Sequence, residues 1–305
     1  MPLLLAVGSS ATAAGSLAVY LALVALAAFA GGSSVAFLSL GHRPMQVLLS
    51  LTGGVLLGVG LLHLLPHAAA ALGHDVEATM GWALAGFFVM FLLERAFHGH
   101  AHHTADGGCD HDHAHGETHA AGHLGHAAGR WAWCGAFAGL ALHSLADGAA
   151  LAASVGADAS HGGGPLSGLA TFLAILLHKP FDAAIIATLL AAAGASRRFR
   201  TVVNVAYALV VPLGAIGFLA SLRLFGGHHD QVLGVALALA GGAFVCIAAA
   251  DLLPEVQFHS HDRLLLTTAL ALGLAIAWGI TALERSSHAH AAHARPAAGG
   301  HGHDH

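Results

Sequence analysis

Two pairs of His and Asp residues recur with the same spacing inside apolar stretches. His143 and Asp147 lie in LALHSLADGAAL, and His178 and Asp182 lie in AILLHKPFDAAI. Residues i and i+4 share one face of an α-helix, so each segment offers an imidazole nitrogen beside a carboxylate. Two such faces turned together would form a four-ligand metal site. Mixed nitrogen and oxygen ligands suit Zn²⁺, and they also admit Fe²⁺, Mn²⁺, Co²⁺, Ni²⁺ or Cd²⁺.

The elements that must position these side chains are membrane helices. The chain of 305 residues is 56% hydrophobic and 9% charged, which is more apolar surface than one soluble core can bury. Its apolar runs have the length that a hydrocarbon layer roughly 30 Å thick requires. We therefore predict an all-α integral membrane protein with eight spans, near residues 16–38, 46–70, 79–97, 131–155, 166–193, 201–225, 230–252 and 264–284.

The arginines predict the orientation, because short cytoplasmic loops accumulate Lys and Arg. With both termini outside, the inner side receives Arg43, Arg95, Arg130, Arg197, Arg198, Arg200 and Arg263, whereas the outer side receives Arg223, Arg285 and Arg295. The same scattering leaves no basic face, so nucleic acid is not expected as a partner.

An internal repeat connects the second and seventh predicted spans. GGVLLGVGLLHLLPH runs from Gly53 to His67, and GGAFVCIAAADLLPE runs from Gly241 to Glu255. The Gly pair, the polar residue, Leu-Leu-Pro and the closing polar residue keep the same spacing in both. Since the two spans run in opposite directions, we predict a 3+2+3 arrangement of inverted repeats, an architecture typical of transporters. Chance recurrence of Gly, Leu and Pro is the alternative explanation.

Histidine is concentrated outside the spans. Ten of the 27 histidines fall between His98 and His126, and six more lie between His288 and His305. Such tracts cannot form a packed core and commonly bind metal. The predicted organisation is spans one to three in 1–97, a disordered cytoplasmic loop in 98–130, spans four and five with the metal site in 131–193, spans six to eight in 194–285, and a His-rich tail in 286–305.

The motifs together resemble the ZIP (Zrt/Irt-like) family of divalent metal transporters over almost the whole chain. GVLLGVGLLHLLPHA resembles the second helix of that family, GFFVMFLLERAFHGH the third helix, HSLADG its fourth-helix HNxPEG-type motif, HKPFDA its fifth-helix HxxPE-type motif, and DLLPE with HSHDR the end of the seventh helix. The resemblance implies zinc uptake across the cytoplasmic (inner) membrane, with the metal as substrate and no organic cofactor. It also implies a block of helices one, four, five and six that moves against a scaffold of the others.

The family motifs carry over at some positions and not at others. His143, Asp147, His178 and Asp182 match the His and acidic positions of the two site motifs. Ser144 stands where the family often has Asn, and Lys179 stands where other members place a ligand of a second metal position. Further departures are Val211 in place of a Glu and His67 in place of an acid. The first metal position is therefore intact, and the case for a second is weakened.

Other polar residues fit a path for metal, each with a structural alternative. His63 and His67 close the second span on the outer side, where they could collect metal or simply lie at the interface. Asp251 and Glu255 end the seventh span on the inner side, as an exit or as solvated helix-end acids. Pro180 removes a backbone donor beside the site and should kink the fifth span.

Three other functions compete with transport by a ZIP-type carrier. One is a cation permease of a different fold. A second is a membrane hydrolase with a metal-bound water, although no separate general base is evident, so we expect no enzyme activity. A third is a non-transporting sensor or buffer, which would depend on the His-rich loop and not on His143 or Asp182. The sequence is also compatible with a homodimer.

The His-rich loop between the third and fourth spans leads to a testable prediction. Deleting residues 98–126 should change regulation or the metal content of the purified protein and should leave the transport step largely intact, because the loop has no apolar stripe that could pack into the bundle. Metal flux into proteoliposomes measures this. Complete loss of transport by a well-folded deletion variant would contradict it.

Overall fold

The computed structural model describes residues 2–34, 42–98, 124–160, 166–258 and 263–293, and all regular structure in these ranges is helical. The long elements are α1 (Pro2–Ser34), α2 (His42–Val59), α4 (Val76–His98), α5 (Leu124–Ser160), α6 (Leu169–Ala192), α9 (His229–Phe258) and α10 (Arg263–His293). The shorter ones are η1 (Gly60–Leu64), α3 (Leu65–Ala71), α7 (Arg197–Ala208), α8 (Val210–Leu224) and η2 (Gly226–His228).

Eight stretches of the described residues are long and apolar enough to cross a membrane. They are Thr12–Ser34, Arg43–Ala71, Val76–Leu93, Trp133–Ser160, Leu169–Ala192, Arg197–Leu224, His229–Ala250 and Arg263–Leu283. The predicted all-α membrane fold with eight spans is thus confirmed. Several helix boundaries differ from the prediction. α1 already begins at Pro2, α5 begins at Leu124 inside the range predicted to be a loop, and α10 continues to His293 inside the range predicted to be a tail. The remainder of the predicted loop, and the end of the predicted tail, lie outside the described residues.

Proline explains why the sixth span consists of two helices. α7 ends at Ala208 and α8 begins at Val210. Pro212 has no N–H to donate to the carbonyl four residues earlier, which is that of Ala208. By contrast, α6 continues through Pro180 as one helix. In the second span Pro66 follows the π-helical turn η1, a wider turn that often occurs at functional sites.

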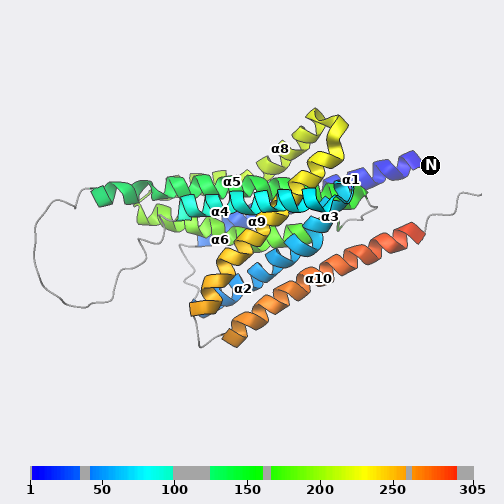
Figure 1. Ribbon diagram of the computed structural model, residues 1–305. Helices are drawn as coiled ribbons and strands as arrows, with labels where there is room; N and C mark the ends of the chain where they lie inside the picture. Colours follow the sequence, from blue (N-terminus) through cyan, green and yellow to red (C-terminus); the bar gives the residue numbers. More distant parts are fainter. Residues whose placement is uncertain (1, 35–41, 99–123, 161–165, 259–262, 294–305) are drawn as a thin grey trace, which may run out of the picture.

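The helices form an elongated bundle with two distinct ends (Figure 1). We call them the Ser160 end, where α5 ends and α6 begins, and the Ala192 end, where α6 ends and α5 begins. The first residues of α1 and the last residues of α10 both lie toward the Ser160 end (Figure 1). The chain therefore crosses the bundle an even number of times.

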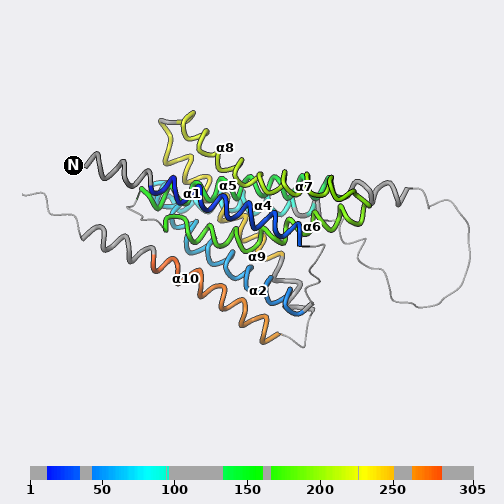
Figure 2. Tube along the Cα trace, turned by 180° about the vertical axis from the view of Figure 1, so that it is seen from behind, coloured from blue at the N-terminus to red at the C-terminus, as the bar shows by residue number. Residues whose placement is uncertain are grey.

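Four helix pairs make the most extensive contacts: α1 with α6, α5 with α8, α2 with α10, and α4 with α9. Figure 2 shows α1 along α6 and α2 along α10 from behind. If spans one, two and three are exchanged with spans six, seven and eight in that order, and span four with span five, each of these helix pairs becomes another of the four pairs. This is the pairing that the predicted inverted repeat requires. Each pair also falls wholly inside the predicted moving block or wholly inside the scaffold.

Glycines bring the paired backbones together. A Cβ on Gly54 would overlap the carbonyl of Leu270 in α10, and one on Gly242 would overlap the carbonyl of Ala83 in α4. These two glycines occupy the same position of the internal repeat, so the repeat encodes the same close packing in both halves. Small residues at such contacts are the usual basis of helix association in lipid, where no hydrophobic effect drives helices together.

The packing makes a second prediction. Gly242→Ala should lower the melting temperature of the detergent-purified protein, because the added methyl group must push α4 and α9 apart, and overpacking of this kind typically costs about 1–3 kcal/mol. Gly217→Ala is the matched control, since nothing lies within 4 Å of a Cβ at Gly217. Equal melting temperatures for the two variants would contradict the prediction.

Candidate metal site

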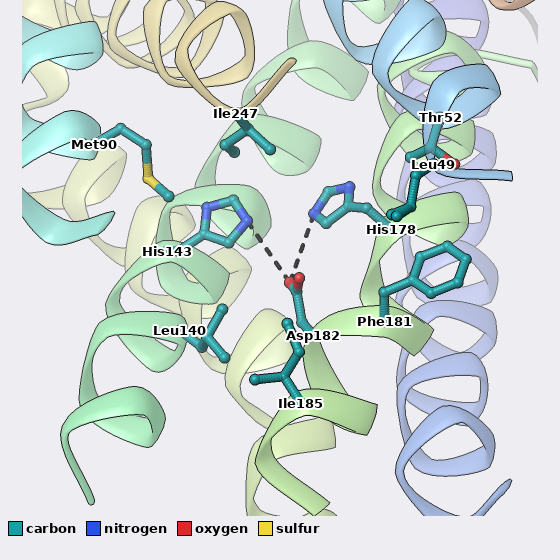
Figure 3. A pocket seen from close by; sticks show the side chains of 10 residues that line it. All are labelled: Leu49, Thr52, Met90, Leu140, His143, His178, Phe181, Asp182, Ile185 and Ile247. Carbon is teal, nitrogen blue, oxygen red and sulfur yellow. Dashed lines mark ion pairs between the residues drawn. The ribbon is translucent and has the colours of Figure 1, made fainter. Parts of the chain in front are cut away.

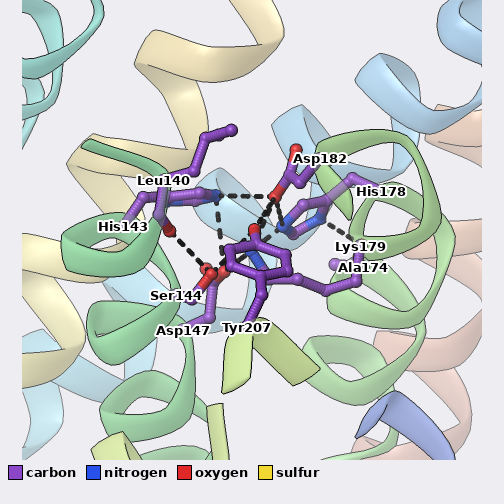
Figure 4. A network of polar contacts seen from close by, with 9 residues as sticks. All are labelled: Leu140, His143, Ser144, Asp147, Ala174, His178, Lys179, Asp182 and Tyr207. Carbon is purple, nitrogen blue, oxygen red and sulfur yellow. Dashed lines mark hydrogen bonds and ion pairs between the residues drawn. The ribbon is translucent and has the colours of Figure 1, made fainter. Parts of the chain in front are cut away.

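The middle portions of α5 and α6 bring the four predicted ligands together (Figure 4). Nε2 of His143 and Nε2 of His178 each lie 3.3 Å from Oδ2 of Asp147. Oδ2 of Asp182 lies 3.8 Å from the first of these nitrogens and 4.0 Å from the second. Ligands in a tetrahedral zinc site, bonded at about 2.1 Å, are themselves about 3.4 Å apart. One donor atom each of His143, His178 and Asp182 can be chosen so that all three lie within 4.8 Å of one another, while Asp147 adjoins both imidazoles.

Lys179 places a positive charge between the two carboxylates of the site. Its Nζ lies 2.6 Å from Oδ2 of Asp147 and 2.7 Å from Oδ2 of Asp182, and its side chain is fully buried. An ammonium in this position compensates two carboxylates that would otherwise be costly within a membrane. One ammonium against two carboxylates leaves one net negative charge, so the site still attracts a cation.

The imidazole of His178 is oriented by its own helix. Nδ1 lies 2.7 Å from the carbonyl oxygen of Ala174, and because a carbonyl only accepts, Nδ1 carries the proton. When an ion is bound, a neutral ring with this tautomer would present the lone pair of Nε2 to the ion. Hydrogen bonding of the distal nitrogen is how proteins usually fix a metal-binding histidine.

Tyr207 and Ser144 hold the Asp182 carboxylate from the other side. The Tyr207 hydroxyl donates to Oδ2 of Asp182 at 3.2 Å. The Ser144 hydroxyl lies 2.9 Å from the Tyr207 oxygen and 2.7 Å from the carbonyl oxygen of Leu140, and it can donate to either. Ser144 thus reaches the site through Tyr207, which α7 contributes (Figure 4).

A cavity adjoins the site. It is lined by His143, His178 and Asp182 together with Leu49, Thr52, Met90, Leu140, Phe181, Ile185 and Ile247. Figure 3 shows the two imidazole rings on either side of the Asp182 carboxylate within this lining. Leu140 precedes His143 on α5 and Ile185 follows Asp182 on α6, so the cavity extends toward the Ala192 end. Toward the Ser160 end, fully buried Leu56, Leu151 and Ile175 follow instead.

Comparison with known proteins shows the family of the chain. The family model described as "ZIP Zinc transporter" matches residues 5–281. The chain belongs to the ZIP zinc transporter family. It is also 26% identical to mouse "Zinc transporter ZIP1" over 264 residues, which cover 79% of each chain. As a ZIP family member it is a multi-pass membrane protein of a transporter family, in agreement with the predicted class and with the expectation that it is not an enzyme.

The other residues predicted for the metal path of this ZIP protein lie in different parts of the structure. Lys179 lies inside the site, and Val211 is buried where its carbonyl oxygen faces Gly148 across the α5–α8 contact. His63 and His67 lie in η1 and α3, in a different cluster at the Ser160 end. Asp251 and Glu255 belong to α9, but their side chains are outside the part of the structure that is described.

Sequence reasoning missed two residues of this ZIP protein. Tyr207 is one of only two tyrosines in the chain and lies in an apolar span, which is the signal that could have drawn attention to it. Asp158 follows Asp147 by about three full helical turns, which places it on the same face of α5. Its partners, however, come from a span whose relative position the sequence does not give.

Proposed function

We propose that this protein moves Zn²⁺ through the bilayer by way of His143, Asp147, His178 and Asp182. The observation that supports this most strongly is the convergence of His143, His178 and Asp182 midway along α5 and α6, with donor atoms within 4.8 Å of one another and Asp147 3.3 Å from both imidazoles. We assign the cavity beside them as the side from which a bound ion would leave. The same donor set accepts Fe²⁺, Mn²⁺, Co²⁺, Ni²⁺ and Cd²⁺.

The proposed direction is uptake into the cytoplasm. Arg43, Arg197 and Arg198 lie at the Ala192 end, and an excess of arginine is typical of the cytoplasmic side. On this assignment both termini face out, the protein resides in the cytoplasmic membrane, and the cavity opens inward. The described conformation is then one that has closed toward the outside and can release its ion to the cytoplasm.

The site is proposed to hold one ion. The Lys179 ammonium occupies the space between Asp147 and Asp182, the position in which carboxylates could bridge two metals. A protonated amine cannot act as a ligand, so it excludes a second ion from this space. At a separation of 4 Å and an effective dielectric constant of 20, its repulsion of a divalent ion is roughly 8 kcal/mol.

The function is tested by His178→Ala. This variant should abolish zinc flux into proteoliposomes, because it removes a ligand whose ring is positioned by Ala174 and contacts both acids. His229→Ala is the matched control, since His229 is exposed at the start of α9. Size-exclusion profiles establish that both variants are folded. Normal flux through His178→Ala would exclude the four-ligand site.

The stoichiometry is tested at Lys179. With the His-rich loop and tail removed, metal analysis should find one tightly bound ion per wild-type chain. Lys179→Asp should raise that number or the affinity for a second ion, because it replaces the repelling charge with a ligand. Lys179→Arg keeps the positive charge and should still bind one ion. Two tight ions in the wild type would contradict the proposal.

A further inference from the structure

A second group of metal-ligating side chains lies at the Ser160 end. Nε2 of His67 is 3.3 Å from Oδ1 of Asp158, and Nε2 of His63 is 4.0 Å from Oδ2 of the same carboxylate. The two imidazole rings are 4.7 Å apart between centroids. One donor atom of each residue can be chosen so that all three lie within 4.8 Å of one another. Two nitrogens and one oxygen form a donor set typical of Zn²⁺.

The surrounding structure orients these side chains. The backbone N–H of Gly168 donates to Oδ2 of Asp158 at 2.6 Å, which turns Oδ1 toward His67. Gly168 has φ +76°, and a Cβ there would overlap Val155. Nε2 of His63 lies 2.9 Å from the Ser154 hydroxyl, which in turn accepts from Thr171 at 2.9 Å. The carboxylate and one imidazole are therefore held before any ion arrives.

The three side chains of this cluster differ in their exposure, which indicates the direction from which an ion can reach them. His63 and Asp158 are each 1% exposed, whereas His67 is 21% exposed. An ion coming from the Ser160 end therefore meets His67 first. Three protein ligands leave a position for water, which is the usual condition for an ion that must exchange.

The cluster is separate from the site between α5 and α6. Asp158 lies about 16 Å beyond Asp147 along the α5 axis, given a rise of about 1.5 Å per residue. The side chains of Leu151 and Ile175 are fully buried between the two levels. An ion held by Asp158 is thus not a second ion of the inner site.

We propose that His63, His67 and Asp158 form an additional binding site for a divalent transition metal ion, which the protein occupies before the ion reaches His143 and His178. The role in capture rests on the proposed function, while the binding itself does not. His63 and His67 belong to the second span, in the predicted scaffold, and Asp158 belongs to α5, in the predicted moving block. Movement of the block at this end would move Asp158 away from His63 and His67. The ion would then be released from the cluster when the path to the inner site opens.

The binding arm of the test uses Cd²⁺ and the full chain. Crystals grown with Cd²⁺ should give one anomalous peak at His143, His178 and Asp182 and another at His63, His67 and Asp158. Asp158→Asn, which can still accept from Gly168, should lose only the second peak. His67→Gln is a second variant, suited to folding because His67 is partly exposed. Asp75→Asn is the matched control, since it removes a charge at an exposed residue outside the cluster.

Measurements of zinc flux distinguish a role of the cluster in metal capture from a purely structural role as an ion pair. Asp158→Asn and His67→Gln should raise KM for Zn²⁺ at least about tenfold with kcat little changed, since even the loss of a hydrogen-bond partner to a metal ligand commonly weakens metal binding tenfold or more. An empty cluster beside an occupied inner site would overturn the proposal, as would unchanged Cd²⁺ binding and KM in both variants. Peaks at the cluster without zinc flux would support this site and reject the proposed transport function.

Discussion

The burial of two carboxylates and one ammonium at the middle of the bundle constrains the rest of the structure. Asp147 and Asp182 are tolerable within a membrane only because Lys179 lies within 2.7 Å of both. Removing Lys179 would leave both carboxylates without a compensating cation, and an uncompensated buried charge is strongly destabilising. The helices that carry these charges must therefore keep their register. Tyr207 extends this requirement to α7 by donating to the Asp182 carboxylate.

Glycine packing supplies that register without polar contacts. Gly148 in α5 meets the backbone of Val211 in α8, and Gly214 in α8 meets that of Leu145 in α5. A reciprocal contact of this kind fixes both the distance and the sliding of two helices, because a step of one residue brings a side chain into the interface. Gly31 of α1 meets Pro180 of α6 beside the site. The charged residues are thus positioned by backbone contacts that any larger residue would disrupt.

The His–Asp pairs and the number of membrane spans could be predicted from the sequence, because they depend on spacing and apolar length along single helices. His143 with Asp147 and His178 with Asp182 are neighbours through helical geometry alone, and eight spans follow from apolar length. What could not be predicted depends on how helices far apart in sequence are placed. The rotamer that turns Lys179 onto both acids and the approach of Asp158 to His67 are of this kind. The division at Leu209 was a local effect of Pro212 that the apolar pattern concealed.

An apolar layer separates the two polar clusters, and it bears directly on the proposed transport of an ion between them. One face of α5 carries His143, Asp147, Ser154 and Asp158, yet Leu151 interrupts it and packs into the same core as Leu56 and Ile175. A dehydrated apolar layer is a high barrier to a divalent ion, whose charge has no partner there. The proposed passage of an ion between the clusters therefore requires α5 and α6 to shift against the second span, so that this layer comes apart. Because Lys179 compensates one of the two negative charges in the absence of metal, the proposed movement would bury less net charge when the site is empty than two carboxylates alone would impose.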